Sequence, residues 1–217
     1  MITSATAVVP SPCENIQSQN IQSYYRFHAA IYDLTRWTFL FGRKRAVDKI
    51  PLLNDDVKKI LEIGCGTGRN LTYLAQRFPH AMIVGIDISD EMMDKARKRT
   101  AMMPQIEVRK SLLPNEEKGN FDVVLMSYAL TMMNPGWEDW ILLAKNTLND
   151  KGYFAVADFH SSIFAWFRRH MSNHHVRMDG HLLPELNKNF KHFYLLKRNA
   201  YFGIWQYFIF IGKKRKN

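Results

Sequence analysis

The sequence predicts an α/β fold in which a doubly wound, mostly parallel sheet ends in an antiparallel hairpin. Three observations predict it. Short apolar runs alternate with helical segments between residues 60 and 157, which is the pattern of parallel strands joined by crossover helices. A glycine-rich turn at residues 64–68 separates the first apolar run from the first helix. Near the C-terminus, residues 192–201 and 204–211 are two strand-like runs with a turn near Gly203.

Composition and charge are those of one globular domain that works on an anionic partner. The chain has 217 residues, of which 47% are hydrophobic, and a formal net charge of +10. This charge predicts nucleic acid, a phospholipid surface or an acidic substrate as the partner. Cys13 and Cys65 do not make a disulfide framework, which favours a reducing cytoplasm. No apolar run approaches the eighteen or so residues of a membrane span, so we expect any membrane contact to be peripheral, at the inner face.

The N-terminal part divides into a tail and a cap. Residues 1–20 are polar without periodicity and are expected to form a flexible tail, and residues 21–217 are expected to form the folded domain. Residues 21–50 combine many aromatic side chains with Arg and Lys, and we expect a helical cap there. Its aromatic residues either fill the core or face a ligand or lipid.

Residues 59–68, KILEIGCGTG, contain the main motif. A short buried strand ends near Glu62 and is followed by Gly64, Gly66 and Gly68, after which a helix is expected over residues 70–77. Glycines at alternate positions allow a ligand to approach the main chain, and the helix N-terminus presents free N–H groups. Because the spacing is G-x-G-x-G rather than the dinucleotide G-x-G-x-x-G, the motif favours S-adenosylmethionine (SAM) over NAD.

The second strand is expected over residues 81–86 and is followed by an acidic residue. Asp87 lies about twenty residues beyond the glycines, where such folds use a carboxylate to hold two ribose hydroxyls. Ser89 is expected to cap the next helix, which turns Met92 and Met93 inward.

Three further strands and one helix complete the alternation. We expect strands at 106–108, 121–126 and 153–157, and a helix at 137–148. Residues 192–201 and 204–211 then form the hairpin. The basic run at 213–216 is expected in a free C-terminus, either as a solvated tail or as a lipid-binding patch.

The string EIGCGTG at 62–68, followed by Asp87 one strand later, resembles the class I SAM-dependent methyltransferases. The resemblance implies a seven-stranded Rossmann-like sheet and a main chain around Gly64 and Gly66 that meets the methionine end of SAM. It also implies that Asp87 holds the ribose and that Ile88 and Met93 pack on adenine. Many members carry an acid after the third strand, but residues 108–112 read VRKSL, so adenine contacts are expected from Ser111 or the main chain.

A narrower resemblance involves residues 24–43, YYRFHAAIYDLTRWTFLFGR, and residues 127–137, SYALTMMNPGW. They resemble the betaine-lipid N-methyltransferases, which trimethylate the amine of diacylglyceryl-homoserine. The resemblance implies that Tyr32 faces the cofactor and that Arg43 pairs with its carboxylate, although Arg43 also fits a solvated basic face. Phosphatidylethanolamine N-methyltransferases and methylators of small soluble amines share this scaffold. The predicted cofactor-binding residues are Tyr32, Arg43, Glu62, Gly64, Cys65, Gly66, Gly68, Asp87, Ile88, Met93, Ser111, Leu112 and Ser127.

Three residues are candidates for the chemistry. Tyr128 follows the fourth strand and either orients the acceptor amine, contacts a cationic product or fills the core. Asp158 and His160 are expected just past the fifth strand, where one of them would accept the ammonium proton unless water takes it first. The N/D-P-P-Y/F string typical of base methylation is missing at 126–128, which makes nucleic acid an unlikely substrate.

The remaining segments leave alternatives open. Residues 161–171, SSIFAWFRRHM, fit either an interfacial helix or a lid. The His and Arg residues from 168 to 181 lack the Cys or paired carboxylates of a metal site and are expected to form a basic loop. A protein of this fold without catalysis, serving as a basic binding module for RNA or membranes, is the alternative from another class.

Overall fold

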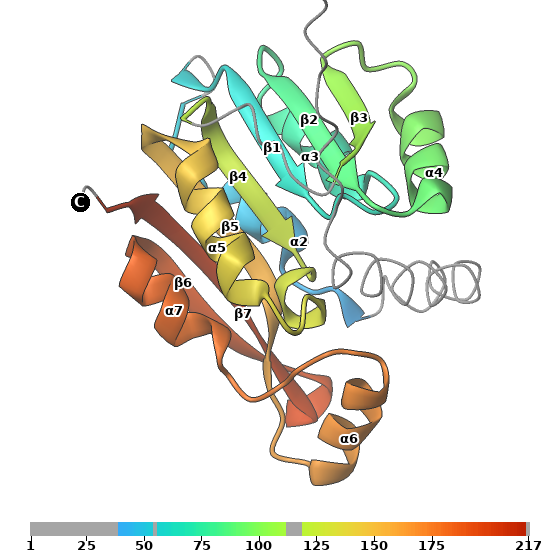
Figure 1. Ribbon diagram of the computed structural model, residues 1–217, viewed down its shortest axis with the longest axis vertical. Helices are drawn as coiled ribbons and strands as arrows, with labels where there is room; N and C mark the ends of the chain where they lie inside the picture. Colours follow the sequence, from blue (N-terminus) through green and yellow to red (C-terminus); the bar gives the residue numbers. More distant parts are fainter. Residues whose placement is uncertain (1–38, 54–55, 112–118, 216–217) are drawn as a thin grey trace, which may run out of the picture.

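The computed structural model describes residues 39–53, 56–111 and 119–215 and contains a seven-stranded sheet (Figure 1). The strand order is β3-β2-β1-β4-β5-β7-β6. The first five strands in this order are parallel, and β7 pairs antiparallel with both β5 and β6. The predicted doubly wound sheet with a C-terminal hairpin is therefore confirmed. The strands are β1 Lys59–Ile63, β2 Met82–Asp87, β3 Ile106–Lys110, β4 Phe121–Ser127, β5 Leu148–Ser161, β6 Phe190–Ala200 and β7 Trp205–Lys214.

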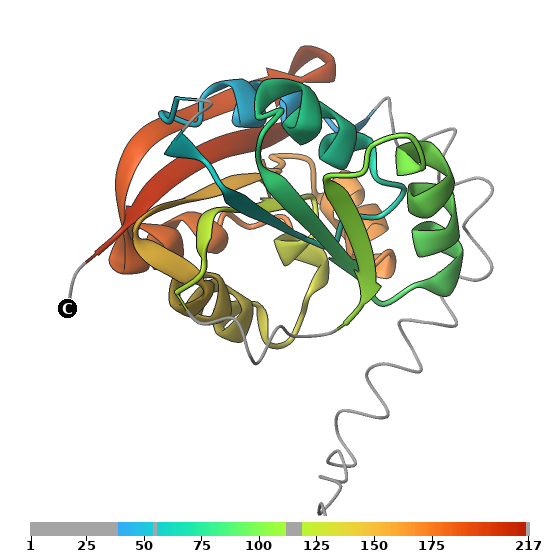
Figure 2. The same ribbon diagram turned by 90° about the horizontal axis from the view of Figure 1, so that it is seen from above.

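Helices cover both faces of this sheet (Figure 2). The apolar core on one face includes residues of α2 and α3, and the core on the other includes residues of α5 and α7. Because both faces are covered, the central strands are apolar on both sides, and β1 is almost fully buried. The described helices are α2 Arg43–Asp48, α3 Arg69–Arg77, α4 Asp90–Thr100, α5 Trp137–Thr147, α6 Ala165–Asn173 and α7 Leu182–Asn189.

Local signals placed several boundaries correctly. Ser89 caps α4, because its Oγ accepts a hydrogen bond from the Met92 N–H at 3.4 Å. The hairpin turns at the short helix η3, Tyr201–Gly203, as expected. Helix α3 ends at Arg77, two residues before Pro79.

Three expectations were wrong. Strand β5 continues to Ser161, because β7 pairs with it as far as Ser161 and Gln206. Asp158 and His160 therefore lie within a strand instead of in a loop. The segment expected to be a basic loop is helical over residues 168–173, which belong to α6, and it is followed by helix α7, which was not predicted. Lys213 and Lys214 belong to β7 and not to a free tail, and the Lys214 ammonium donates to the Leu148 carbonyl at 3.0 Å.

Part of the N-terminal prediction lies outside the described residues. The tail 1–20 and residues 21–38 of the cap are among these. Within the described part of the cap, α2 is helical and buries Ala46 and Val47. None of the helices in the described ranges has both the length and the apolar character that crossing a bilayer requires.

Candidate cofactor and acceptor site

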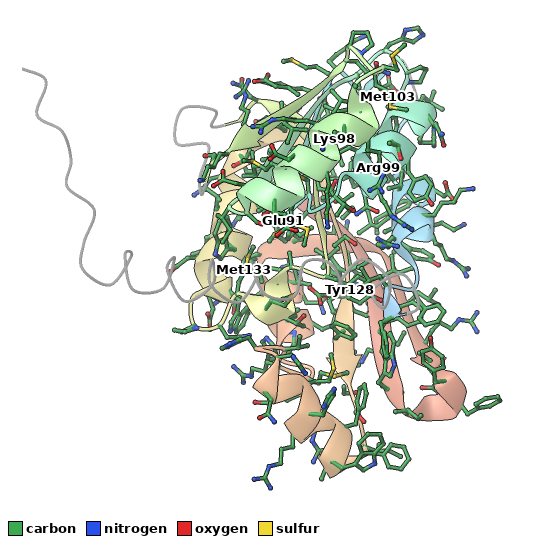
Figure 3. All side chains as sticks on the ribbon, turned by 90° about the vertical axis from the view of Figure 1, so that its right-hand side faces the viewer. Glu91, Lys98, Arg99, Met103, Tyr128 and Met133 are labelled. Carbon is green, nitrogen blue, oxygen red and sulfur yellow. The ribbon has the colours of Figure 1, made fainter. Side chains whose placement is uncertain are left out.

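The candidate site lies at the carboxyl edge of the parallel strands. β1, β2 and β4 are neighbours, so their last residues, Ile63, Asp87 and Ser127, reach this edge together. In open α/β sheets, ligands bind outside the carboxyl ends of the strands. Figure 3 looks onto this side of the molecule, with Glu91 of the first turn of α4 above Tyr128 and Met133, which follow β4.

The glycine turn between β1 and α3 has the backbone shape that the sequence predicted. Gly64, Gly66 and Gly68 have φ values of 72°, 53° and 76°, in the left-handed region that favours glycine. A Cβ atom on Gly64 would also come within 3.1 Å of the Ala129 Cβ. A side chain at this position would therefore be both strained and crowded.

The N–H groups of this turn are used inside the protein. Those of Gly64 and Cys65 both donate to the Ile86 carbonyl, at 2.9 and 3.0 Å, and that of Gly68 donates to the Cys65 carbonyl at 3.0 Å. Any ligand contact from these three residues would therefore use carbonyl oxygens and Cα atoms instead of N–H donors. Carbonyl oxygens suit a cationic ligand such as the ammonium and sulfonium groups of SAM.

Asp87 is held in position at the end of β2. Its Oδ2 accepts from the Gly66 N–H at 2.8 Å, and its Oδ1 accepts from the Ser89 N–H at 3.0 Å. A carboxylate has about four lone-pair positions, so two remain for other donors. This arrangement couples the glycine turn to the start of α4 and leaves capacity for the two ribose hydroxyls expected from the sequence.

A buried polar group lies beneath the turn. Glu62 is fully buried, and its Oε1 accepts from the Asn70 Nδ2 at 2.6 Å. The Asn70 Oδ1 and the Ser127 Oγ are buried, and neither has a hydrogen-bond partner in the part of the chain that the structure describes. An unsatisfied buried polar atom costs about 1 to 3 kcal/mol, so these atoms fit a polar ligand at this edge. Asn70 was missed at first, although its place on the first turn of the helix after the glycines was a usable signal.

The other predicted cofactor residues differ in burial and in position relative to the glycine turn. Ile88 is half-buried and Met93 is buried, as expected for residues beneath an adenine ring, and Ser111 directly follows β3. The Cys65 side chain belongs to the apolar core cluster that includes Leu71 of α3, and its thiol donates to the Gly66 carbonyl at 4.0 Å. Tyr32 and Leu112 lie outside the described residues.

Tyr128 links the cap to the end of β4. It is 1% exposed and has a left-handed φ of 55°. Its hydroxyl donates to the Phe41 carbonyl at 2.8 Å, and its ring packs edge-on against Phe159. Burial, reinforced by the Asp158 charge, raises the pKa of Tyr128 well above its usual value, while the nearby Arg43 guanidinium acts in the opposite direction. The structure thus brings together Tyr128, Asp158 and Arg43, three of the residues selected from the sequence.

Asp158 is fully buried and holds the loop after β4. Its Oδ1 accepts from the Thr131 Oγ1 at 2.5 Å and from the Phe159 N–H at 2.8 Å, and its Oδ2 accepts from the Thr131 N–H at 3.3 Å. Burial raises the pKa of Asp158 to about 6 despite these hydrogen bonds. These contacts make Asp158 a positioning residue for this loop. Nothing in the sequence signalled Thr131 as its partner.

His160 lies farther along β5 and has different neighbours. Its ring is 6.1 Å from that of Phe208, and a Cβ on Gly180 would come within 3.0 Å of its Cε1. Burial, followed by the positive charge of Lys197, lowers the pKa of His160. The ring is therefore neutral at neutral pH, as a proton acceptor must be. The base role predicted for His160 stays a prediction.

Comparison with known proteins agrees with this geometry. Residues 60–152 match the family model described as a methyltransferase domain. The trans-aconitate 2-methyltransferase of Azoarcus sp. (strain BH72) is 39% identical over 59 residues, which are 27% of this chain and 21% of that protein. The stretches matched in the first curated relatives cover 19% to 32% of their lengths.

Solved structures share the fold over most of the chain. The 1,6-didemethyltoxoflavin-N1-methyltransferase of Burkholderia thailandensis, with S-adenosylhomocysteine bound, has a TM-score of 0.68 at 15% identity, covering 98% of this chain and 94% of that one. A Haloferax volcanii chain in complex with the Trm112 methyltransferase activator has a TM-score of 0.73 at 13% identity, covering 90% of this chain and 98% of that one. These likenesses show the class I methyltransferase fold.

Proposed function

We propose that this chain, whose residues 60–152 match a family model described as a methyltransferase domain, is a SAM-dependent methyltransferase that acts on the amine of a small-molecule acceptor. The finer proposal is that this amine belongs to a lipid headgroup, best matched by diacylglyceryl-homoserine. The observation that carries the proposal is the left-handed glycine turn at the end of β1, which is hydrogen-bonded to Asp87 at the end of β2.

Different residues at this edge would bind different parts of SAM, which supplies an electrophilic methyl group when bound. Asp87 would accept hydrogen bonds from the ribose hydroxyls through its two remaining lone-pair positions. Glu62 and Asn70 would present oxygen atoms to the ammonium group. Ile88 and Met93 would provide the apolar surface for adenine.

The acceptor amine must be neutral when it reacts, because its lone pair attacks the methyl group. The protein therefore has to align the amine, and a side chain or water has to accept the proton of its ammonium form. Arg43 and Tyr128 would shape the wall on the cap side, and Asp158 would hold the loop after β4 through Thr131. His160 is the proposed proton acceptor. His160→Ala should then lower turnover mainly below the pKa of the amine, and a uniform loss across pH would contradict a base role.

An aromatic cluster beside Tyr128 supports an amine acceptor. The Phe41 ring lies 5.6 Å from that of Tyr201, 5.9 Å from that of Trp205 and 5.9 Å from that of Tyr207. Aromatic faces attract methylated ammonium groups through cation–π interactions. Because the Phe41 carbonyl accepts the Tyr128 hydrogen bond, this cluster is connected to the candidate site.

Two measurements test the proposal. Calorimetry should detect SAM binding to the full chain. The absence of binding at millimolar SAM would refute the proposal that the chain is a SAM-dependent methyltransferase. Mass spectrometry should then detect steps of one methyl group on diacylglyceryl-homoserine. Methyl transfer to phosphatidylethanolamine or a soluble amine instead would agree with methyltransferase activity and would refute diacylglyceryl-homoserine as the acceptor. RNA or membrane binding without any transfer would favour the non-catalytic module.

A further inference from the structure

One end of the molecule exposes large apolar side chains. Ile163 is 82% exposed, Trp166 is 63% exposed and Phe202 is 112% exposed, and Phe164 and Tyr201 are also exposed. We call these five residues the apolar tip. The exposure of Phe202 means that its ring projects from the surface without packing on its neighbours. Large exposed apolar groups that gather at one place mark an interaction surface.

The apolar tip joins two segments that are distant in sequence. Ile163 and Phe164 directly precede α6 and Trp166 lies in its first turn, whereas Tyr201 and Phe202 lie in the turn of the β6–β7 hairpin. The Ser162 Oγ donates to the Ile204 carbonyl at 2.5 Å, which holds the start of this segment against the hairpin. Figure 1 shows α6 and the hairpin turn at the same end of the molecule.

The hairpin turn keeps bulky residues in a strained backbone. Tyr201 and Phe202 have φ values of 45° and 56°, where Gly or Asn would be more favourable. Packing within the protein does not offset this strain at Phe202, because its ring is exposed. The ring is therefore available to a partner outside the chain.

The surroundings of the apolar tip are basic. Neither residues 161–178 nor residues 186–217 contain an Asp or Glu. Arg168 and Arg169 of α6 and Lys197 and Arg198 of β6 are exposed. Apolar rings flanked by cations are the composition of segments that insert into an anionic membrane interface.

We propose that the apolar tip docks the protein on an anionic phospholipid bilayer. A second copy of the chain fits less well, because like charges around the two tips would repel. A nucleic acid would pair its phosphates with the cations and stack its bases on the rings, but the aliphatic Ile163 can do neither. The bilayer uses both features, because rings and aliphatic groups enter the interface while the cations meet the headgroups.

Docking at this end would place the candidate site beside the membrane. The Tyr201 ring contacts Phe41 at 5.6 Å, and the Phe41 carbonyl holds the Tyr128 hydroxyl at the end of β4. The inference rests on the proposed function in that a lipid headgroup is the acceptor that makes such docking useful. The docking itself is measurable without any methyl transfer.

Co-sedimentation of the full chain with vesicles tests the proposal. Vesicles of phosphatidylcholine alone are compared with vesicles that also contain phosphatidylglycerol. We expect binding to the anionic vesicles and at least about a tenfold weakening for each of Trp166→Ser and Phe202→Ser, because burying one large apolar side chain is worth that factor or more. Met102→Ser, at a 92% exposed residue beyond α4, is the matched control and should bind like the wild type. Arg169→Glu combined with Arg198→Glu should remove the preference for anionic vesicles.

Several results would overturn the docking proposal. One is equal vesicle binding by the wild type and the double variant Trp166→Ser/Phe202→Ser, and another is equal binding of the wild type to neutral and anionic vesicles. The proposal is also overturned if the wild type binds no vesicles but forms a dimer that the double variant abolishes, or if it binds RNA and no vesicles. Both substituted residues are exposed, and circular dichroism verifies that the variants fold. SAM calorimetry on the same variant separates the two proposals, since loss of docking with intact SAM binding concerns the apolar tip alone.

Discussion

Replacing Asp158 by Asn tests how the buried carboxyl affects stability. Asp158 is fully buried and its pKa is raised from 3.8 to about 6, so the folded state holds this proton more tightly than the unfolded state does. As pH rises through this window, the unfolded state loses its proton first, and the free energy of unfolding falls. With 1.36 kcal/mol for each pKa unit, the loss is about 3 kcal/mol and is complete above the folded-state pKa.

The Asn variant has no proton to lose at this position, so it lacks this part of the pH dependence. Its amide also replaces one acceptor oxygen that faces Thr131 or the Phe159 N–H, at a cost of about 1 to 3 kcal/mol. This cost is the same at every pH. The difference in unfolding free energy, variant minus wild type, should therefore rise by about 2.4 kcal/mol between pH 4 and pH 7, because the rest of the 3 kcal/mol is lost below pH 4.

Urea unfolding of both proteins, followed by circular dichroism at several pH values between 4 and 7, measures this difference. All other titrating groups cancel when the two proteins are subtracted. Asp94→Asn is the control for removing an exposed carboxylate, since Asp94 is exposed and pairs with Arg97 on the same helix. A flat difference for Asp158→Asn would refute the assigned burial and its pKa.

Three more substitutions test the cofactor edge and the cap. Asp87→Ala should weaken SAM binding by about 1.5 to 3 kcal/mol in calorimetry, while Asp94→Ala should not; equal affinities would mean that the ribose lies elsewhere. Gly64→Ala should lower stability by about 1 to 2 kcal/mol and weaken SAM binding. Gly119→Ala, at the same φ of 72° but with no atom of the described residues within 4 Å of the added Cβ, should show only the cost of the left-handed backbone. Identical losses would remove the crowding argument. Tyr128→Phe should lower the free energy of unfolding by about 1 kcal/mol by removing one hydrogen bond, and an unchanged urea midpoint would contradict that bond.

The sequence by itself determined the fold class and the glycine turn. Buried parallel strands require apolar runs, and a tight turn at a strand's end requires glycines, so both leave local patterns. The place of Asp87 at the end of β2 was predicted, because its distance from the glycines reflects one crossover helix and one strand. The hairpin was also visible, since its two strands are separated by only a short turn.

Only the tertiary structure decided the surroundings of Tyr128 and Asp158. β5 extends past Ala157 because β7, about fifty residues later, pairs with it, and this pairing moves Asp158 from an expected loop into the core. Its partner Thr131 and the Tyr128 partner Phe41 come from distant segments, and no local pattern announces such contacts. The apolar tip likewise exists only because the start of α6 and the hairpin turn meet in space. Burial and nonlocal hydrogen bonds depend on which elements pack together, and that information is not local to any stretch of the chain.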